Sequence, residues 1–118
     1  MKTVLFEVME PAAAMERIKA TLKSGKPDKY ARMTFRSADA LARTMTPSRW
    51  TVVEAMTGAG VLGVREIARR VGRDVKGVHN DVNALVLAGV VERTEDGKYL
   101  FPFDRVKVQF EFAARAAA

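Results

Sequence analysis

The chain has 118 residues, enough for one domain with a single hydrophobic core but short for two. Hydrophobic residues make up 48% of it and charged residues 29%, as in an ordinary soluble globular protein. The chain contains no cysteine, which excludes disulfides and thiolate chemistry and fits a reducing cytosol. The formal net charge of +6 suggests a polyanionic partner, because basic side chains release the counterions condensed on phosphate groups.

The positive charge is unevenly distributed along the chain. Residues 1–60 carry ten basic and six acidic side chains, whereas residues 61–118 carry ten and eight. The excess in the first half comes from a dense basic run at Arg17, Lys19, Lys23, Lys26, Lys29, Arg32 and Arg36.

The sequence shows no targeting or membrane signal. The apolar run of the N-terminal segment MKTVLFEVMEP is broken by Glu7 and is followed by no small-residue cleavage site, so we expect no signal peptide. No stretch approaches the roughly 18 apolar residues of a membrane helix. We therefore expect a cytoplasmic protein.

The first 36 residues have the pattern of a strand, a helix and a second strand. Residues 2–8 and residues 30–36 both alternate between apolar and other side chains. Between them, Pro11 is well placed at a first helical position, and Ser24-Gly25 ends the helix. The apolar stripe of this helix consists of Met15, Ile18 and Leu22.

Two further helices are predicted in the next segment. Ser37 can cap a short helix that runs to about residue 45 and buries Leu41 and Met45. Thr46 and Pro47 then mark a second start, with threonine at the N-cap and proline in the first turn. This second helix, residues 47–57, would present Trp50, Val53 and Met56 to the core.

Residues 64–90 have the pattern of a helix-turn-helix. A first helix, residues 64–71, turns Ile67, Ala68 and Val71 inward and ends at Gly72, a residue that suits a left-handed turn. Asp74 can cap a second helix, residues 74–88, which stops at a glycine. Its apolar residues lie on one helical stripe, namely Val75, Val78, Val82 and Leu85.

The opposite face of this second helix is polar but carries little charge. It presents Lys76, Gly77, Asn80 and Asn83, with His79 at its border. Such side chains suit the reading of base edges better than simple solvation. Glycine at an exposed helix position lowers helix propensity by about 1 kcal/mol relative to alanine, so Gly77 suggests a close approach to its backbone.

The rest of the chain is predicted to be extended. Residues 90–94 and 98–101 flank Glu95-Asp96-Gly97, and Asp-Gly between two strand-like runs is a strong hairpin signal. Residues 105–112 alternate again, with an apolar face made of Val106, Val108, Phe110 and Phe112. Residues 113–118 have no pattern and are expected to fray.

This order of elements resembles the winged helix-turn-helix of MarR- and ArsR-type regulators. The likeness is carried by TPSRW, VREIARRVGRDVKGVHNDVNALVLAGVVER and FPFDRVKVQFEF, with FRSADALARTMT before them. It extends to a small MarR-like group of predicted prokaryotic transcriptional regulators, some of them antitoxin-like. The resemblance implies a positioning helix at residues 64–71, a recognition helix at 74–88 and a wing at 92–101. The long C-terminal dimerisation helix of MarR regulators has no counterpart in the alanine-rich tail, so any dimer would have to use the N-terminal strand-helix-strand or the C-terminal strand.

We therefore expect an α+β fold with three parts. Residues 1–45 would form an N-terminal strand-helix-strand extension with a short helix, and could serve as a dimerisation unit. Residues 46–112 would form the winged helix-turn-helix domain with its C-terminal strand, and residues 113–118 a frayed tail.

The expected function is sequence-specific binding of double-stranded DNA by a homodimeric transcriptional regulator. The base-reading candidates are Lys76, Gly77, His79, Asn80 and Asn83. The phosphate and wing candidates are Arg65, Arg69, Arg70, Arg73, Arg93 and Lys98. Asp81, which is acidic on the same helix, is expected to turn away from DNA or to pair with a neighbouring arginine.

Two alternatives remain open at this point. The polar helix could dock a protein instead of a groove, as in an antitoxin-like partner of a toxin, and Leu87 near its C-terminal end favours that reading. The basic run from Arg17 to Arg36 could extend the DNA footprint, form the solvated face of a dimerisation unit, or meet an acidic protein such as a cognate toxin.

An enzyme is not favoured. His79 is the only histidine, and no cluster of Asp, Glu and His has metal-ligand spacing. Gly58-Ala59-Gly60 lacks the lysine and the hydroxyl residue of a phosphate-binding loop. We expect no catalytic residues, no metal and no cofactor.

Overall fold

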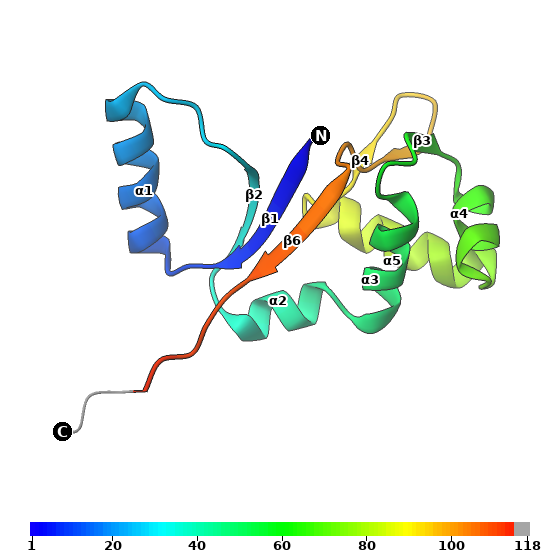
Figure 1. Cartoon of the computed structure of the whole chain (residues 1–118). Helices are drawn as coiled ribbons and strands as arrows, with labels where there is room; N and C mark the ends of the chain where they lie inside the picture. The colour runs from blue at the N-terminus through cyan, green and yellow to red at the C-terminus, as the bar shows by residue number, and fades with distance from the viewer. Residues whose placement is uncertain (115–118) are drawn as a thin grey trace.

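A computed structural model describes residues 1–114 and shows a mixed α+β fold with two three-stranded sheets (Figure 1). The first sheet contains β1 (Thr3–Val8), β2 (Ala31–Phe35) and β6 (Arg105–Gln109), in the order β2-β1-β6. The second contains β3 (Val61–Leu62), β4 (Glu92–Arg93) and β5 (Tyr99–Leu100), in the order β3-β5-β4. The helices are α1 (Pro11–Ser24), α2 (Ala38–Thr44), α3 (Pro47–Met56), α4 (Val64–Val71) and α5 (Val75–Leu87).

The first sheet is parallel and has the N-terminal strand at its centre. β1 pairs with β2 on one side and with β6 on the other, so that Phe6 lies between Met33 and Val108. Parallel neighbours need a crossover connection, and α1 supplies it between β1 and β2. The C-terminal strand therefore joins the N-terminal segment in one sheet.

A continuous hydrophobic core joins this sheet to helices α2–α5. Val4 and Phe6 of β1 are fully buried in the same cluster as Val78 and Leu85 of α5. The ring of Phe6 lies 5.2 Å from that of Trp50 on α3, centroid to centroid. A small sheet needs a hydrophobic face or a packed helix to be stable, and here the inner face of the three-stranded sheet is covered by the helices.

Helix α1 stands outside this core. None of its residues is buried, and Met15, Ile18 and Leu22 are 52%, 50% and 77% exposed. Figure 1 shows α1 on the far side of β1 and β2 from helices α3–α5. The apolar stripe expected from the sequence is thus present, and most of it faces outward.

The local signals read from the sequence were largely confirmed. Ser37 Oγ accepts a hydrogen bond from Ala40 N–H at 3.0 Å, and α2 ends where expected. Gly72 has φ of 68° at the end of α4, as the left-handed turn requires. Thr46 is the N-cap of α3, but its side chain makes no capping bond, and its hydroxyl lies 3.3 Å from Ser48 Oγ.

The last strand is shorter than the sequence pattern suggested. β6 ends at Gln109, although the alternation continues to Phe112. The reason is the length of its partner, because Gln109 pairs with Glu7 and β1 ends one residue later. Of the tail expected to fray, residues 115–118 lie outside the described part. No helix in residues 1–114 is long and apolar enough to cross a membrane.

Replacing Phe6 with alanine is expected to lower the free energy of unfolding by about 3–5 kcal/mol, because it opens a cavity where the sheet meets α3. Chemical denaturation followed by both far-UV circular dichroism and Trp50 fluorescence should show one shifted transition by both probes. The control Met15→Ala alters an exposed side chain and should change stability by less than about 0.5 kcal/mol. Separate transitions for sheet and helices would contradict a shared core.

Candidate nucleic-acid interface

The segment from α4 to α5 is held by its own backbone and by a cap. Arg73 N–H donates to Ala68 C=O at 3.1 Å across the Gly72 turn. Asp74 accepts a hydrogen bond from Gly77 N–H at 2.8 Å, as expected for an N-cap. The buried stripe of Val78, Val82 and Leu85 then fixes the face of α5 that points outward.

That outward face carries the residues expected to read bases. Lys76, His79 and Asn80 are exposed, and Gly77 and Asn83 are half-buried. Lys76, His79, Asn80 and Asn83 follow the spacing of neighbours on one helical face. The structure therefore brings these four side chains together on one surface.

Asn83 bonds a residue of the small sheet, which the sequence did not indicate. Tyr99 on β5 is buried, and its hydroxyl donates to Asn83 Oδ1 at 3.2 Å. The side-chain amide of Asn83 also lies 3.3 Å from His79 Nε2. A buried tyrosine needs a partner for its hydroxyl. Asn83 thus links α5 to the small sheet and fixes the position of His79.

Asp81 is paired with two arginines from other elements. Arg73 Nη1 donates to it at 2.7 Å and Arg49 Nε of α3 at 3.3 Å. Burial alone would raise the pKa of Asp81, but hydrogen bonds from Arg73, Ser48 and Arg49 outweigh it and leave the pKa below its usual value of 3.8. The expected pairing of Asp81 is confirmed. It holds Arg73, a phosphate candidate, against α5.

The close approach expected at Gly77 is made by the protein itself. A Cβ atom at this position would lie 2.9 Å from the Arg73 guanidinium and 3.1 Å from the Asp74 carboxylate. Gly77 therefore gives Arg73 room to pass over the first turn of α5 and reach Asp81.

On α4, two of the arginines share one carboxylate. Arg70 Nε donates to Glu66 Oε2 at 2.9 Å, and Arg69 donates to both Glu66 oxygens. These bonds lower the pKa of Glu66 to about 2, and the bond from Arg69 contributes the most. Arg65 is exposed one residue earlier. The phosphate candidates of α4 thus include two arginines whose charge is partly compensated.

The hairpin between β4 and β5 has the turn that the sequence predicted. Gly97 has φ of 80°, and its N–H donates to Thr94 C=O at 3.0 Å. The hydroxyl of Thr94 accepts a hydrogen bond from Lys98 N–H at 3.0 Å. Arg93 and Lys98 are both exposed on this hairpin.

The whole segment of residues 64–98 is close to electrically neutral. It contains seven basic and six acidic side chains. Three of the carboxylates have local partners, because Asp74 caps α5 while Glu66 and Asp81 hold arginines. The exposed charge that remains for a polyanion is carried mainly by Arg65, Lys76, Arg93 and Lys98.

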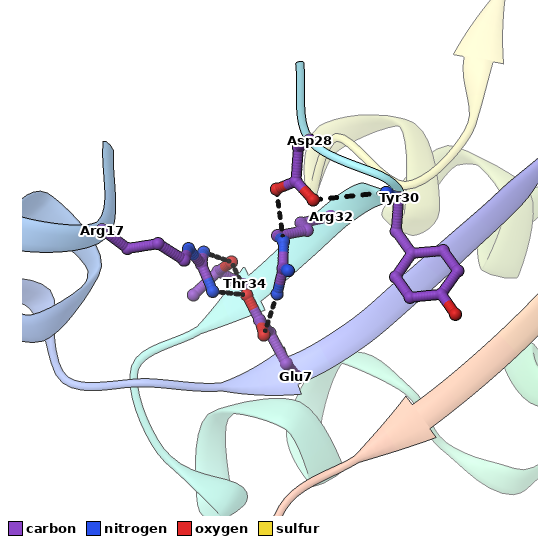
Figure 2. Close-up of polar contacts among 6 residues, drawn as sticks. All are labelled: Glu7, Arg17, Asp28, Tyr30, Arg32 and Thr34. Carbon is purple, nitrogen blue, oxygen red and sulfur yellow. Dashed lines mark hydrogen bonds and ion pairs between the residues drawn. The ribbon is translucent and has the colours of Figure 1, made fainter. Parts of the chain in front are cut away.

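A second charged cluster lies on the outer face of the parallel sheet (Figure 2). Glu7 is buried there at 6% exposure, and it accepts hydrogen bonds from Arg32 at 2.8 Å and Thr34 at 2.9 Å. Arg17 of α1 approaches Glu7 Oε1, the oxygen that Thr34 also binds, as an ion pair rather than an aligned hydrogen bond. Arg32 also donates to Asp28 at 2.6 Å and thereby lowers the pKa of Asp28.

This cluster changes the interpretation of the basic run. Two of its seven members, Arg17 and Arg32, compensate a buried carboxylate and tie α1 and β2 to β1. A buried carboxylate is costly unless it is paired and hydrogen-bonded. These two arginines therefore have a structural role, and the remaining members of the run are exposed lysines and Arg36.

The model of the HVO_A0114 family matches residues 44–108, more than half of the chain, and the chain belongs to this family. The matched segment begins at the end of α2, covers α3–α5 and the small sheet, and ends in β6. No curated protein matches the chain. Within residues 1–114, no group of three or more His, Cys, Asp or Glu could hold a metal ion.

The variant Asp81→Asn is expected to be less stable than the parent by about 1–3 kcal/mol at neutral pH, because Arg49 and Arg73 lose a partly buried anion. Since folding lowers the pKa of Asp81, its contribution is complete above the ordinary carboxyl pKa and is lost as the pH falls below about 4. The difference in stability should therefore shrink in acid, as measured by urea denaturation at several pH values.

The control for this experiment is Asp39→Asn. Asp39 pairs with Arg43 on the surface of α2, where both side chains are more than two-thirds exposed, so its loss should cost less than about 0.5 kcal/mol. A stability difference for Asp81→Asn that stays constant from neutral pH to pH 2 would count against the ion-pair assignment.

Proposed function

We propose that α3, α4 and α5 with the β3-β5-β4 sheet form a MarR-like winged helix-turn-helix, and that the protein is a sequence-specific DNA-binding transcriptional regulator. In this proposal α5 enters the major groove and the β4–β5 hairpin contacts the backbone or minor groove. The observation that carries it is the outward face of α5, where Lys76, His79, Asn80 and Asn83 are collected on one side of a firmly buried helix.

The base-reading roles follow from exposure and chemistry. Asn80 is exposed and its amide can bond adenine through two hydrogen bonds, while Lys76 can donate to guanine. His79 and Asn83 are already bonded to each other, and Asn83 accepts from Tyr99, so they have less freedom to meet a base. Asn80 and Lys76 are therefore the principal readers.

The phosphate contacts are assigned first to the basic side chains that are exposed and have no ion pair to a carboxylate within residues 1–114. Arg65 precedes the Glu66 cluster, and Arg93 and Lys98 project from the hairpin. Arg69 and Arg70 would exchange Glu66 for a DNA phosphate. Arg73 is bonded to Asp81, and this bond limits its contact with the DNA backbone. With few unpaired cations, the salt dependence of binding should be moderate.

The regulator is proposed to act in the cytoplasm as a homodimer on a pseudo-palindromic site, with half-sites about one helical turn apart. Selection of retained sequences from random duplex DNA, repeated over a salt series, tests the function directly. Enrichment of a two-fold symmetric motif supports the proposal. Absence of any enriched sequence would reject it.

Asn80→Ala is expected to weaken binding to the selected site by about 1–3 kcal/mol and to leave random-sequence binding unchanged, because only a base contact is lost. Arg65→Ala should weaken both kinds of DNA alike and flatten the salt slope. Fluorescence anisotropy with matched specific and random duplexes measures both effects. Equal losses on the two duplexes for Asn80→Ala would contradict its assignment as a base reader.

Glu66→Gln is expected to tighten binding to every duplex by about threefold to tenfold, because Arg69 and Arg70 lose their internal anion and become available to phosphate. The salt slope should steepen in parallel. Glu16→Gln provides the matched control, since it removes the same charge from the pair with Lys19 on α1, away from α4 and α5. An equal gain for both variants would mean that only net charge matters.

One observation favours a second function. Leu87, at the C-terminal end of α5, is 90% exposed and could be buried by a protein partner. An antitoxin-like protein that docks a toxin through α5 would bury this side chain. In that case DNA selection fails, and Leu87→Ser abolishes the protein interaction.

A further inference from the structure

We propose that β6 forms an antiparallel pair with β6 of a second copy of the chain, centred on Gln109, to give a continuous sheet in the order β2-β1-β6-β6-β1-β2. The dimer in the proposed function rests on this surface, whereas the DNA contacts of α5 do not. The proposal stands on the free edge of β6, the apolar row along it, the groove beside it and the match of charges across it.

The outer edge of β6 is available for pairing. β6 pairs only with β1 among the strands described. Arg105 N–H donates to Lys2 C=O at 3.2 Å, and it is paired with Thr3. Because backbone groups alternate in direction along a strand, Arg105, Lys107 and Gln109 face β1, while Val106 and Val108 direct their N–H and C=O groups outward.

An apolar row runs along this open edge. Val108, Phe110 and Phe112 are 49%, 43% and 85% exposed, and they continue the alternation that begins at Val106. The rings of Phe110 and Phe112 contact each other in an edge-to-face arrangement, 5.6 Å apart. A long edge strand with exposed apolar residues pairs readily with another chain unless it is blocked by charge, proline or a bulge. β6 contains no proline, and its charged residues Arg105 and Lys107 lie on the face opposite Val106 and Val108, so the apolar row is uninterrupted.

The free edge of β2 lacks these features. Its apolar residues Met33 and Phe35 pack against the core, and Thr34 and Arg32 on its other face bind Glu7. β6 is therefore the edge at which pairing buries exposed apolar surface.

A groove beside β6 can receive the aromatic rings of the second copy. It has a volume of about 570 Å³ and is lined by Trp50, Val53, Glu54, Thr57, Val106 and Val108. A smaller hollow of about 240 Å³ continues along the strand past Leu41, Met45, Trp50, Val108 and Phe110. Figure 1 shows β6 at the edge of its sheet.

Centring on Gln109 is the register that matches both faces of the strand. It sets Lys107 opposite Glu111 of the second copy, on the outer face of the sheet. On the inner face it sets Val108 opposite Phe110 and Val106 opposite Phe112, so the ring of Phe112 falls at the larger groove. Cross-strand pairs of opposite charge and of aromatic with β-branched side chains are the stabilising kind.

Neighbouring registers lose part of this match. Centring on Lys107 places two lysines side by side, and centring on Val108 places Phe112 opposite Asp104. Centring on Phe110 leaves Lys107 opposite Ala113. Because a two-residue slip keeps the faces but changes every partner, the charges select among these registers.

The test measures the oligomeric state of the full chain by sedimentation equilibrium over a range of concentrations. The parent protein should be a dimer. Val108→Pro removes one outward N–H and no bond to β1, so it should weaken dimerisation at least about tenfold while the far-UV spectrum stays unchanged. A monomeric parent, or a folded Val108→Pro variant that dimerises as tightly as the parent, would overturn the proposal.

A charge exchange tests the register. Glu111→Lys and Lys107→Glu each place like charges opposite one another and should each weaken the dimer several-fold. The double variant Lys107→Glu with Glu111→Lys restores opposite charges and should recover most of the affinity. Because Lys107 also donates to Tyr30 Oη at 3.1 Å, the thermal unfolding of each variant is compared as a check on folding. A folded double variant as weak as the singles would overturn the Gln109 register.

The outcome is separable from the proposed DNA binding. A monomeric Val108→Pro variant that retains Asn80-dependent preference for a half-site supports both proposals. A parent that dimerises through β6 but enriches no DNA sequence supports the pairing and rejects the DNA function.

Discussion

The orientation of α5 depends on the burial of Val78, Val82 and Leu85, and the rest of the candidate site depends on that orientation. With these three side chains fully enclosed, the helix cannot rotate without exposing apolar surface. The polar face is therefore presented as a fixed surface, and Asp74 and Gly72 fix where the helix begins. Tyr99 and Arg49 then attach the same helix to the small sheet and to α3.

Three carboxylates, two of them mostly buried and one on the surface, organise much of the charge of the molecule. Glu7, Asp81 and Glu66 each bind two arginines. As a result, a net charge of +6 does not amount to one open basic surface. The pairs at Glu7 and Asp81 are partly buried and connect elements far apart in the chain, whereas the Glu66 pair lies on a single helix and can exchange its partners.

The sequence predicted the features that depend on neighbouring residues. Pro11, Ser37, Gly72 and Asp74 act through the backbone beside them, so the ends of α1, α2, α4 and α5 could be placed. Contacts between distant residues left no comparable signal. The alternation of residues 105–112 predicted a strand but not its parallel pairing with β1, and the sequence did not indicate that the Arg73 side chain lies over Gly77. Arg49 and Tyr99 were missed for the same reason.

The position of β1 between β2 and β6 has a consequence for biosynthesis. Thr3 is paired with Arg105, so β1 acquires its second neighbour only after helices α1–α5 and the small sheet between them have been synthesised. Until then the edge of β1 that pairs with β6 is open. Sequence-distant pairing of this kind is slow to form, and incomplete sheets expose apolar surface. The contacts among α3, α4 and α5 are local, so these helices can fold first. β1 can then pack against them before β6 is available.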